Sequence, residues 1–150
     1  MTYSHAPATP DPDLHPQFYT GIPFKRFLAW IVDVLLVFLF CVLVLPFTAF
    51  TGLFFFPFMM LVVGFAYRVA TLTNGSATWG MRLMGMELRD RRDQPFDFAT
   101  ALLHTIGYSL SMTVAPLQLV SVVLVCTTAR CQSLTDMVLA SAPVNCRLNR

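Results

Sequence analysis

The sequence predicts an all-α membrane protein, a small helical bundle of three transmembrane segments, with a fourth if the third apolar region is broken or re-entrant. Hydrophobic residues make up 56% of the 150 residues and charged residues only 12%, with a mean hydropathy of +0.64. A soluble domain carries about twice that share of charge. Apolar runs long enough to cross a bilayer recur along the chain. The net charge of +2 is small, and we expect the lipid bilayer rather than a nucleic acid as partner.

The amino-terminal segment differs from the rest of the chain. Residues 1–23 contain five prolines and almost no aliphatic residues. Such a segment buries too little apolar surface to offset the entropy lost on ordering. We therefore expect a disordered, proline-rich cytoplasmic tail over residues 1–22, followed by one transmembrane domain over residues 23–148. The tail has no apolar core, so it does not read as a cleaved signal peptide.

The first predicted span covers residues 25–46. From Phe27 to Leu45 the run is apolar except for Asp33, and a bilayer core requires roughly 20 such residues. An acid at this depth costs on the order of a few kcal/mol, so it should face protein or water and have a partner. The candidate partners are Arg26, Arg68, Arg82, His104 and Arg130.

The second predicted span covers residues 53–72. The connecting segment 46–52 carries no charge, and Pro57 falls in the first turn of the span, where its missing N–H is least costly. At 1.5 Å per residue, the two runs and their turn amount to roughly 60 Å of helix, or two crossings. The opening of the domain is therefore predicted to be a helical hairpin.

Residues 73–97 are more polar. Asn74-Gly75 is a turn signal, Leu83–Leu88 alternates weakly, and Asp90–Pro95 is a charged turn. This pattern favours a short cytoplasmic β-hairpin or an interfacial loop. Asp97 is placed to cap a following helix.

The third apolar region, residues 98–128, contains no acid, Lys or Arg and is about ten residues longer than one span needs. A span over residues 100–128 would be one tilted helix, kinked at Pro116. Alternatively, two short arms turn near Ala115-Pro116 and return. We favour the kinked span, because non-helical backbone within the bilayer would need shielding by protein.

The final segment contains Ser133-x-x-Asp136, which fits a capping box at the start of a short helix. Pro143 ends that helix. Val144, Cys146 and Leu148 then alternate as a short strand would.

The distribution of positive charge predicts the orientation. None of the ten Lys and Arg residues lies in the turn between the first two spans. The positive-inside rule therefore places the amino terminus and residues 73–97 in the cytoplasm of a multi-pass protein of the cell (inner) membrane. Three straight spans would send Arg130, Arg147 and Arg150 to the other side, whereas a re-entrant third region would keep every cation on one side.

Few residues could carry chemistry. Arg26, Asp33 and Asp136 form the candidate polar cluster, either as a buried ion pair that fixes helix packing or as a proton or cation site. Arg82 and His104 are secondary candidates. Phosphate loops, nucleophile elbows and paired metal ligands do not occur in the sequence, and the four cysteines form no CxxC pair. We expect no enzymatic activity, no metal and no cofactor.

Three motifs in order resemble the RDD family of small prokaryotic membrane proteins, named for one arginine and two aspartates. Phe24, Arg26 and Asp33 match the first helix of that family. The middle motif TxGxRLxGxxxxD matches Thr78, Gly80, Arg82, Leu83, Gly85 and Asp90. The closing motif matches Gln132, Leu134 and Asp136. His104 stands where an arginine commonly opens the third hydrophobic region.

The resemblance covers about residues 20–148 and implies an integral membrane protein of RDD type. Some members of that family look like cation or proton antiporters, and others look like accessory membrane components. Two functions follow. The protein is a scaffold or accessory component, acting with other membrane proteins or as a homo-oligomer, or it is an oligomeric cation/proton transporter that uses Asp33.

Overall fold

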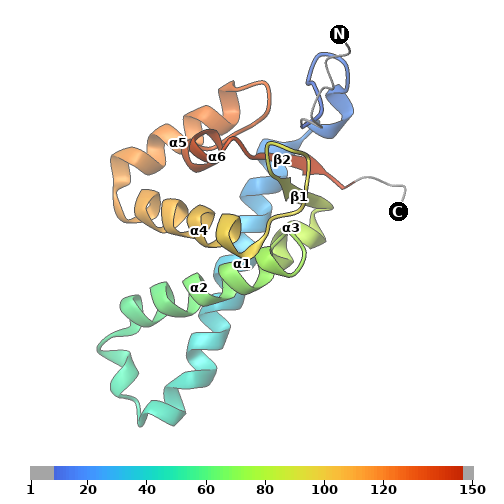
Figure 1. The fold of residues 1–150 in the computed structure, drawn as a ribbon. Helices are drawn as coiled ribbons and strands as arrows, with labels where there is room; N and C mark the ends of the chain where they lie inside the picture. Colours follow the sequence, from blue (N-terminus) through green and yellow to red (C-terminus); the bar gives the residue numbers. More distant parts are fainter. Residues whose placement is uncertain (1–8, 147–150) are drawn as a thin grey trace.

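The computed structural model describes residues 9–146, and most of them are helical (Figure 1). Six α-helices and two short strands follow one another in this part of the chain, together with three short 3₁₀ helices, Pro16–Phe18, Leu45–Thr48 and Thr51–Leu53. Their bounds are α1 Ile22–Val44, α2 Phe56–Thr73, α3 Trp79–Leu83, β1 Met86–Arg89, α4 Phe98–Thr113, α5 Ala115–Thr127, α6 Leu134–Leu139 and β2 Ala142–Asn145.

The predicted helical hairpin is present. Helices α1 and α2 are long and apolar enough to cross a membrane, at about 35 and 27 Å. Two 3₁₀ helices join them, and the backbone reverses through Ala49 and Phe50, both with positive φ. Phe38 packs edge-on against Phe56 near the turn, with 5.7 Å between ring centroids. In Figure 1 the tip of this hairpin extends well beyond the other helices.

The third apolar region is broken, contrary to the favoured kinked span. Helices α4 and α5 are bent by 116° relative to each other at Val114, which has extended backbone angles. Pro116 lies in the first turn of α5, where it needs no hydrogen-bond partner. Its ring would clash with the carbonyl of Met112 if α4 continued through it. The two-armed alternative therefore describes the structure, and α5 returns toward the strands (Figure 1).

The strands also differ from the expected local hairpin in residues 73–97. Met86–Arg89 pairs antiparallel with Ala142–Asn145, from the far end of the domain. The local alternative fails because Thr78 caps a short helix, α3, in which its side chain accepts from the Met81 N–H. Asp90 then closes its own loop by accepting from the Arg92 and Gln94 amides. Of the expected strand residues, Val144 lies in β2, Cys146 follows the end of β2 at Asn145, and Leu148 lies outside the described residues. Pro143, expected to end the preceding helix, lies within β2, and that helix ends at Leu139.

The described part of the expected disordered tail, residues 9–22, is packed against β2. Tyr19 is buried, and its hydroxyl donates to the Pro10 carbonyl over 2.7 Å. The Asn145 side-chain amide donates to the carbonyls of Gln17 and Thr20. Composition did not reveal this order, because one buried tyrosine and a distant asparagine supply the contacts. Residues 1–8 lie outside the described part.

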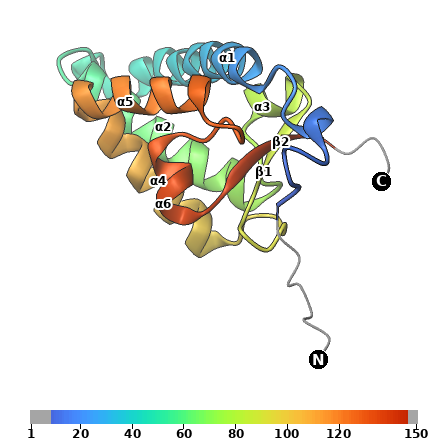
Figure 2. The same cartoon turned by 90° about the horizontal axis from the view of Figure 1, so that it is seen from above.

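Burial is concentrated at one end of the molecule. Ile22, Leu72, Met86 and Leu88 are completely buried where α1, α2 and the strands meet. Elsewhere α1 and the hairpin tip expose large apolar side chains, up to 90% for Phe47. Figure 2 shows the strands and α3 gathered at one end of α1. A small packed end with apolar helices projecting from it suits a chain whose helices are covered by lipid.

Candidate functional site

Asp136 lies at the centre of the first polar network. It is completely buried, and one carboxylate oxygen, Oδ2, accepts from Arg26 Nη1 of α1 over 2.7 Å. The other oxygen, Oδ1, lies 2.8 Å from His104 Nε2 of α4. Because an ionised carboxylate only accepts, the Nε2 atom carries the proton. One side chain thus joins three helices that are far apart in sequence.

Contacts within residues 133–136 orient the Asp136 carboxylate independently of its partners on other helices. Ser133 caps α6 by accepting from the Asp136 amide, and Asp136 Oδ2 accepts in return from the Ser133 amide over 2.9 Å. The predicted capping box is therefore present, and the same carboxylate also makes the ion pair. Close packing sets α6 on α4, because a Cβ at Gly107 would lie 2.7 Å from Thr135 Cγ2.

The charge state of Asp136 follows from these contacts. Burial disfavours ionisation, but the Arg26 guanidinium, His104 and the Ser133 N–H together outweigh it. They hold the pKa of Asp136 well below its usual range. Asp136 is therefore a permanent anion at neutral pH, and its charge is matched by the cation of Arg26.

Asp33 belongs to a second network with no described cation in it. Its Oδ1 atom accepts from the Tyr67 hydroxyl at 2.8 Å and from the Gly80 N–H at 2.9 Å. Its Oδ2 atom accepts from the Thr78 hydroxyl at 2.6 Å. Within residues 9–146, no Lys, Arg or His forms an ion pair with Asp33, so the expected charged partner is replaced by neutral donors.

The contact between α1 and α3 makes this second network possible. A Cβ at Gly80 would overlap the Ala29 carbonyl and lie 2.8 Å from Asp33 Oδ1. Glycine therefore allows the backbone of α3 to approach α1 closely enough for its N–H to reach the carboxylate. The Trp79 N–H in turn donates to the Tyr67 hydroxyl over 3.1 Å, which fixes Tyr67 in place.

The structure thus divides the predicted cluster. Arg26 and Asp136 are brought together, His104 joins them, and Asp33 lies in a separate network. Arg82 contacts neither carboxylate: its guanidinium donates to the Ala77 carbonyl over 3.2 Å and reaches the Thr71 carbonyl at 3.5 Å, near the end of α2.

Sequence reasoning did not identify Tyr67 as a site residue, nor did it give Thr78 and Gly80 a role toward Asp33. The signal available for the last two was their place in the middle motif, directly after the second span. Sequence reasoning named Arg68 as a candidate partner of Asp33, whereas the structure buries it in the wall of a cavity.

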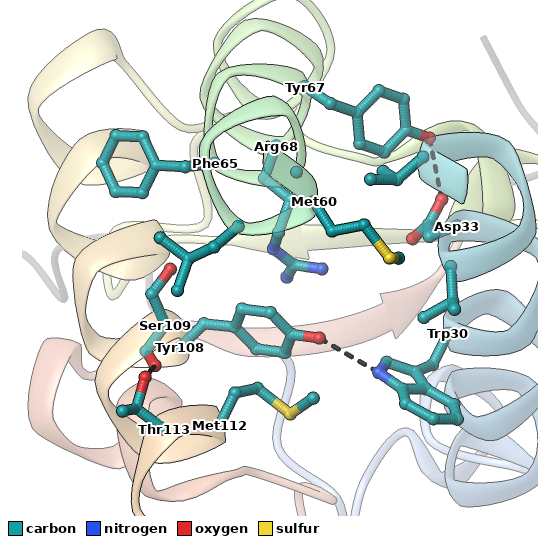
Figure 3. A pocket seen from close by; sticks show the side chains of 14 residues that line it. Trp30, Asp33, Met60, Phe65, Tyr67, Arg68, Tyr108, Ser109, Met112 and Thr113 are labelled. Carbon is teal, nitrogen blue, oxygen red and sulfur yellow. Dashed lines mark hydrogen bonds between the residues drawn. The ribbon is translucent and has the colours of Figure 1, made fainter. Parts of the chain in front are cut away.

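A cavity of about 340 Å³ lies between α1, α2 and α4. Figure 3 shows Arg68 of α2 pointing into it, with the guanidinium over the ring of Tyr108. The distance from Arg68 Cζ to the ring centroid is 3.7 Å. Trp30 Nε1 donates to the Tyr108 hydroxyl over 3.0 Å and so closes one side of the cavity. Asp33 lines the same cavity.

Metal ligands do not gather at either network. Among residues 9–146, no group of three or more His, Cys, Asp and Glu side chains could hold a metal ion. Of the four cysteines, Cys41 and Cys131 are buried, and Cys126 and Cys146 are exposed.

Comparison with known proteins gives one match, to a family model. No curated protein sequence and no solved structure matches the chain significantly. The sequence model of the RDD family matches residues 20–140, which is more than half of the chain and includes both buried aspartates and Arg26. This protein is therefore a membrane protein that belongs to the RDD family.

Proposed function

We propose that the protein is a scaffold or accessory component of the cell membrane, without enzymatic activity, cofactor or nucleic-acid partner. The observation that carries the proposal is that Asp136 is fully buried and that both of its carboxylate oxygens already have partners. These partners are Arg26, His104 and Ser133. A carboxylate held in this way ties helices together and is poorly placed to bind and release an ion during transport. Its partners are other membrane proteins or further copies of the chain.

A cation/proton transporter is the second candidate, and one observation favours it. Asp33 lies in the wall of the cavity between α1, α2 and α4 and has no described cationic partner. A carboxylate that faces a cavity within a span is the usual position for an ion-coupled site. The narrow bundle would then form a pathway only as an oligomer.

Proteoliposomes loaded with a pH-sensitive dye separate the two candidates. Wild-type protein and Asp33→Asn are exposed to Na⁺ or K⁺ gradients. The asparagine keeps a side-chain oxygen to accept from Tyr67 and Gly80, so the bundle should remain assembled, but it carries no charge. The scaffold proposal expects no cation-dependent proton flux from either protein. Flux in the wild type that disappears in correctly assembled Asp33→Asn would support transport instead.

We also propose that the protein lies in the membrane with its amino terminus in the cytoplasm. The Arg26–Asp136 ion pair supports an even number of passes, because it ties the segment after α5 to the start of α1. Single cysteines at Leu14, Val138 and Phe47, all strongly exposed, test this in a variant whose four native cysteines are replaced. An impermeant thiol reagent added outside intact cells should label the cysteine at 47 alone. Labelling at 138 would support an odd number of passes.

A further inference from the structure

Arg68 is a buried cation without a described anionic partner. Only 8% of its surface is exposed, and its Nε atom is buried without a hydrogen-bond partner. No Asp or Glu within residues 9–146 forms an ion pair with it. Asp33, the carboxylate among the residues that line the cavity, already accepts from Tyr67, Thr78 and Gly80. Stacking on Tyr108 offsets part of the cost of burying this charge but does not replace an anion.

The cavity around Arg68 has one polar end and one apolar end. Arg68, Tyr108, Trp30 and Asp33 form the polar end, and both oxygens of Asp33 already accept from neutral donors. The Tyr108 hydroxyl, which accepts from Trp30, can donate its own proton to an oxygen of a ligand. The other end is lined by Val37, Met60, Leu61 and Gly64 of the α1–α2 hairpin. The volume of about 340 Å³ is at the lower end of the range for small-molecule sites. This shape suits a ligand with an anionic head and an apolar chain.

The mouth of the cavity lies on the apolar surface of the bundle. The lining residues Trp30, Leu61 and Met112 are 38–49% exposed, and lipid covers such a surface in a membrane-spanning helix. Arg68 is five residues before the end of α2, or about 7.5 Å along the axis, close to the level at which hydrocarbon gives way to headgroups. A lipid alongside the bundle therefore has its headgroup near Arg68.

We propose that this cavity binds one anionic phospholipid, with a phosphate oxygen on the Arg68 guanidinium and an acyl chain along the α1–α2 hairpin. The guanidinium is the side chain best suited to a phosphate, because its N–H groups match the phosphate oxygens in geometry and charge. The site does not depend on whether the protein is a scaffold or a transporter.

Trp30 provides a direct reporter for this site. The chain has two tryptophans, and Trp79, 54% exposed, lies outside the cavity lining. In a Trp79→Phe background, vesicles containing acyl-brominated phosphatidylglycerol or acyl-brominated phosphatidylcholine are compared by quenching of Trp30 fluorescence. Both headgroups carry an ionised phosphate, but phosphatidylcholine also brings a choline cation next to the Arg68 guanidinium. We therefore expect phosphatidylglycerol to be preferred about tenfold. Equal quenching by the two lipids would overturn the proposal.

Four variants test whether the preference for phosphatidylglycerol arises in the cavity. Arg68→Gln should abolish the preference for phosphatidylglycerol, and Arg68→Lys should keep most of it. Arg82→Gln removes an exposed cation of α3 that lies near the same end of α2, and it should leave the preference unchanged. Gly64→Leu fills part of the cavity while keeping the positive charge of Arg68, and gives a second test if Arg68→Gln does not fold. Loss of the preference in Arg82→Gln, or its persistence in both Arg68→Gln and Gly64→Leu, would show that surface charge attracts the lipid.

Competition distinguishes the possible sources of the anionic head. Unlabelled phosphatidylglycerol should restore Trp30 fluorescence, whereas inorganic phosphate and laurate should not do so at the same concentration. Restoration by inorganic phosphate alone would make this a simple anion site, and restoration by laurate at lower concentration than phosphatidylglycerol would make it a fatty-acid site. Either result would overturn the assignment to a phospholipid.

Discussion

Asp136 and Asp33 are both buried, but the negative charges of their carboxylates are stabilised in different ways. Asp136 lies at the packed end of the molecule and is balanced by a full positive charge, Arg26, with His104 and Ser133 adding hydrogen bonds. Asp33 lies within a span and is balanced by the neutral donors Tyr67, Thr78 and Gly80. Charge pairing is therefore used where the chain returns to α1, and oriented dipoles are used where α2 and α3 pack against α1.

This difference has a consequence for substitution. Removal of Asp136 leaves the partly buried charge of Arg26 unpaired, whereas removal of Asp33 leaves only unpaired dipoles. The first loss costs more than the second. The two sites should therefore respond differently to the same amino-acid change, and the following predictions test that ordering.

Asp136→Leu should be the most damaging single change. It leaves Arg26 with no anion and removes the partner of buried His104, at a cost of about 3–5 kcal/mol in the free energy of unfolding. Denaturant titration in detergent, followed by circular dichroism, measures this loss. The double variant Arg26→Met, Asp136→Leu should be less unstable than Asp136→Leu alone, because the uncompensated charge is gone. If the double variant is the less stable of the two, the ion pair is not what holds α6 to α1.

Asp33→Leu should cost less, about 2–4 kcal/mol, because it leaves three unpaired donors but no unpaired charge. Asp33→Asn should cost about 1 kcal/mol, since its side-chain oxygen still accepts and its amide can donate to the Thr78 hydroxyl. The same unfolding measurement applies. Equal losses for leucine and asparagine would mean that Asp33 is held by its charge, and the contrast with Asp136 would disappear.

Features that depend on a local residue pattern could be predicted from the sequence. The α1–α2 hairpin follows from two long apolar runs, and the capping box follows from Ser133 and Asp136, three residues apart. The RDD resemblance, confirmed over residues 20–140, rests on motifs of the same local kind. Such features need no knowledge of distant contacts, because helix length and caps are set within a few residues of where they occur.

The features that sequence reasoning missed all depend on contacts between distant segments. β1 pairs with a strand more than fifty residues later, and the partners of Asp33 come from α2 and α3. The sequence slightly favoured one kinked span over the break between α4 and α5, because Pro116 is compatible with a kink and with a turn. The return of α5 then places Asp136 on Arg26 instead of near Asp33. Pairing of this kind is set by tertiary packing, which residue spacing does not encode.

The close approach of α3 to α1 can be tested apart from the carboxylate. In Gly80→Ala the added methyl would overlap the Ala29 carbonyl and press on Asp33 Oδ1, so α3 must move away from α1. We expect a loss of about 1–3 kcal/mol. Gly64→Ala is the matched control, because its Cβ would lie 3.6 Å from Val37 Cγ1, an ordinary contact. It should be neutral or stabilising by up to about 1 kcal/mol. Equal tolerance at both sites would contradict the contact of α3 with α1.

The smallest expected effect is the dependence of stability on acid. The pKa of Asp136 is lower in the folded protein than in the unfolded chain, because Arg26, His104 and the Ser133 N–H outweigh the opposing effect of burial. Its contribution is therefore complete above the unfolded value of about 3.9 and is lost as the pH falls below that value, by at most about 1.4 kcal/mol per pH unit. Other carboxylates titrate in the same range, so the informative quantity is the difference in unfolding free energy between wild type and Asp136→Asn. That difference should be constant between about pH 5 and 8 and should shrink below about pH 4. A difference that instead grew on acidification would mean that protonation of Asp136 stabilises the fold, and the ion pair with Arg26 would not be the contact that holds the returning segment in place.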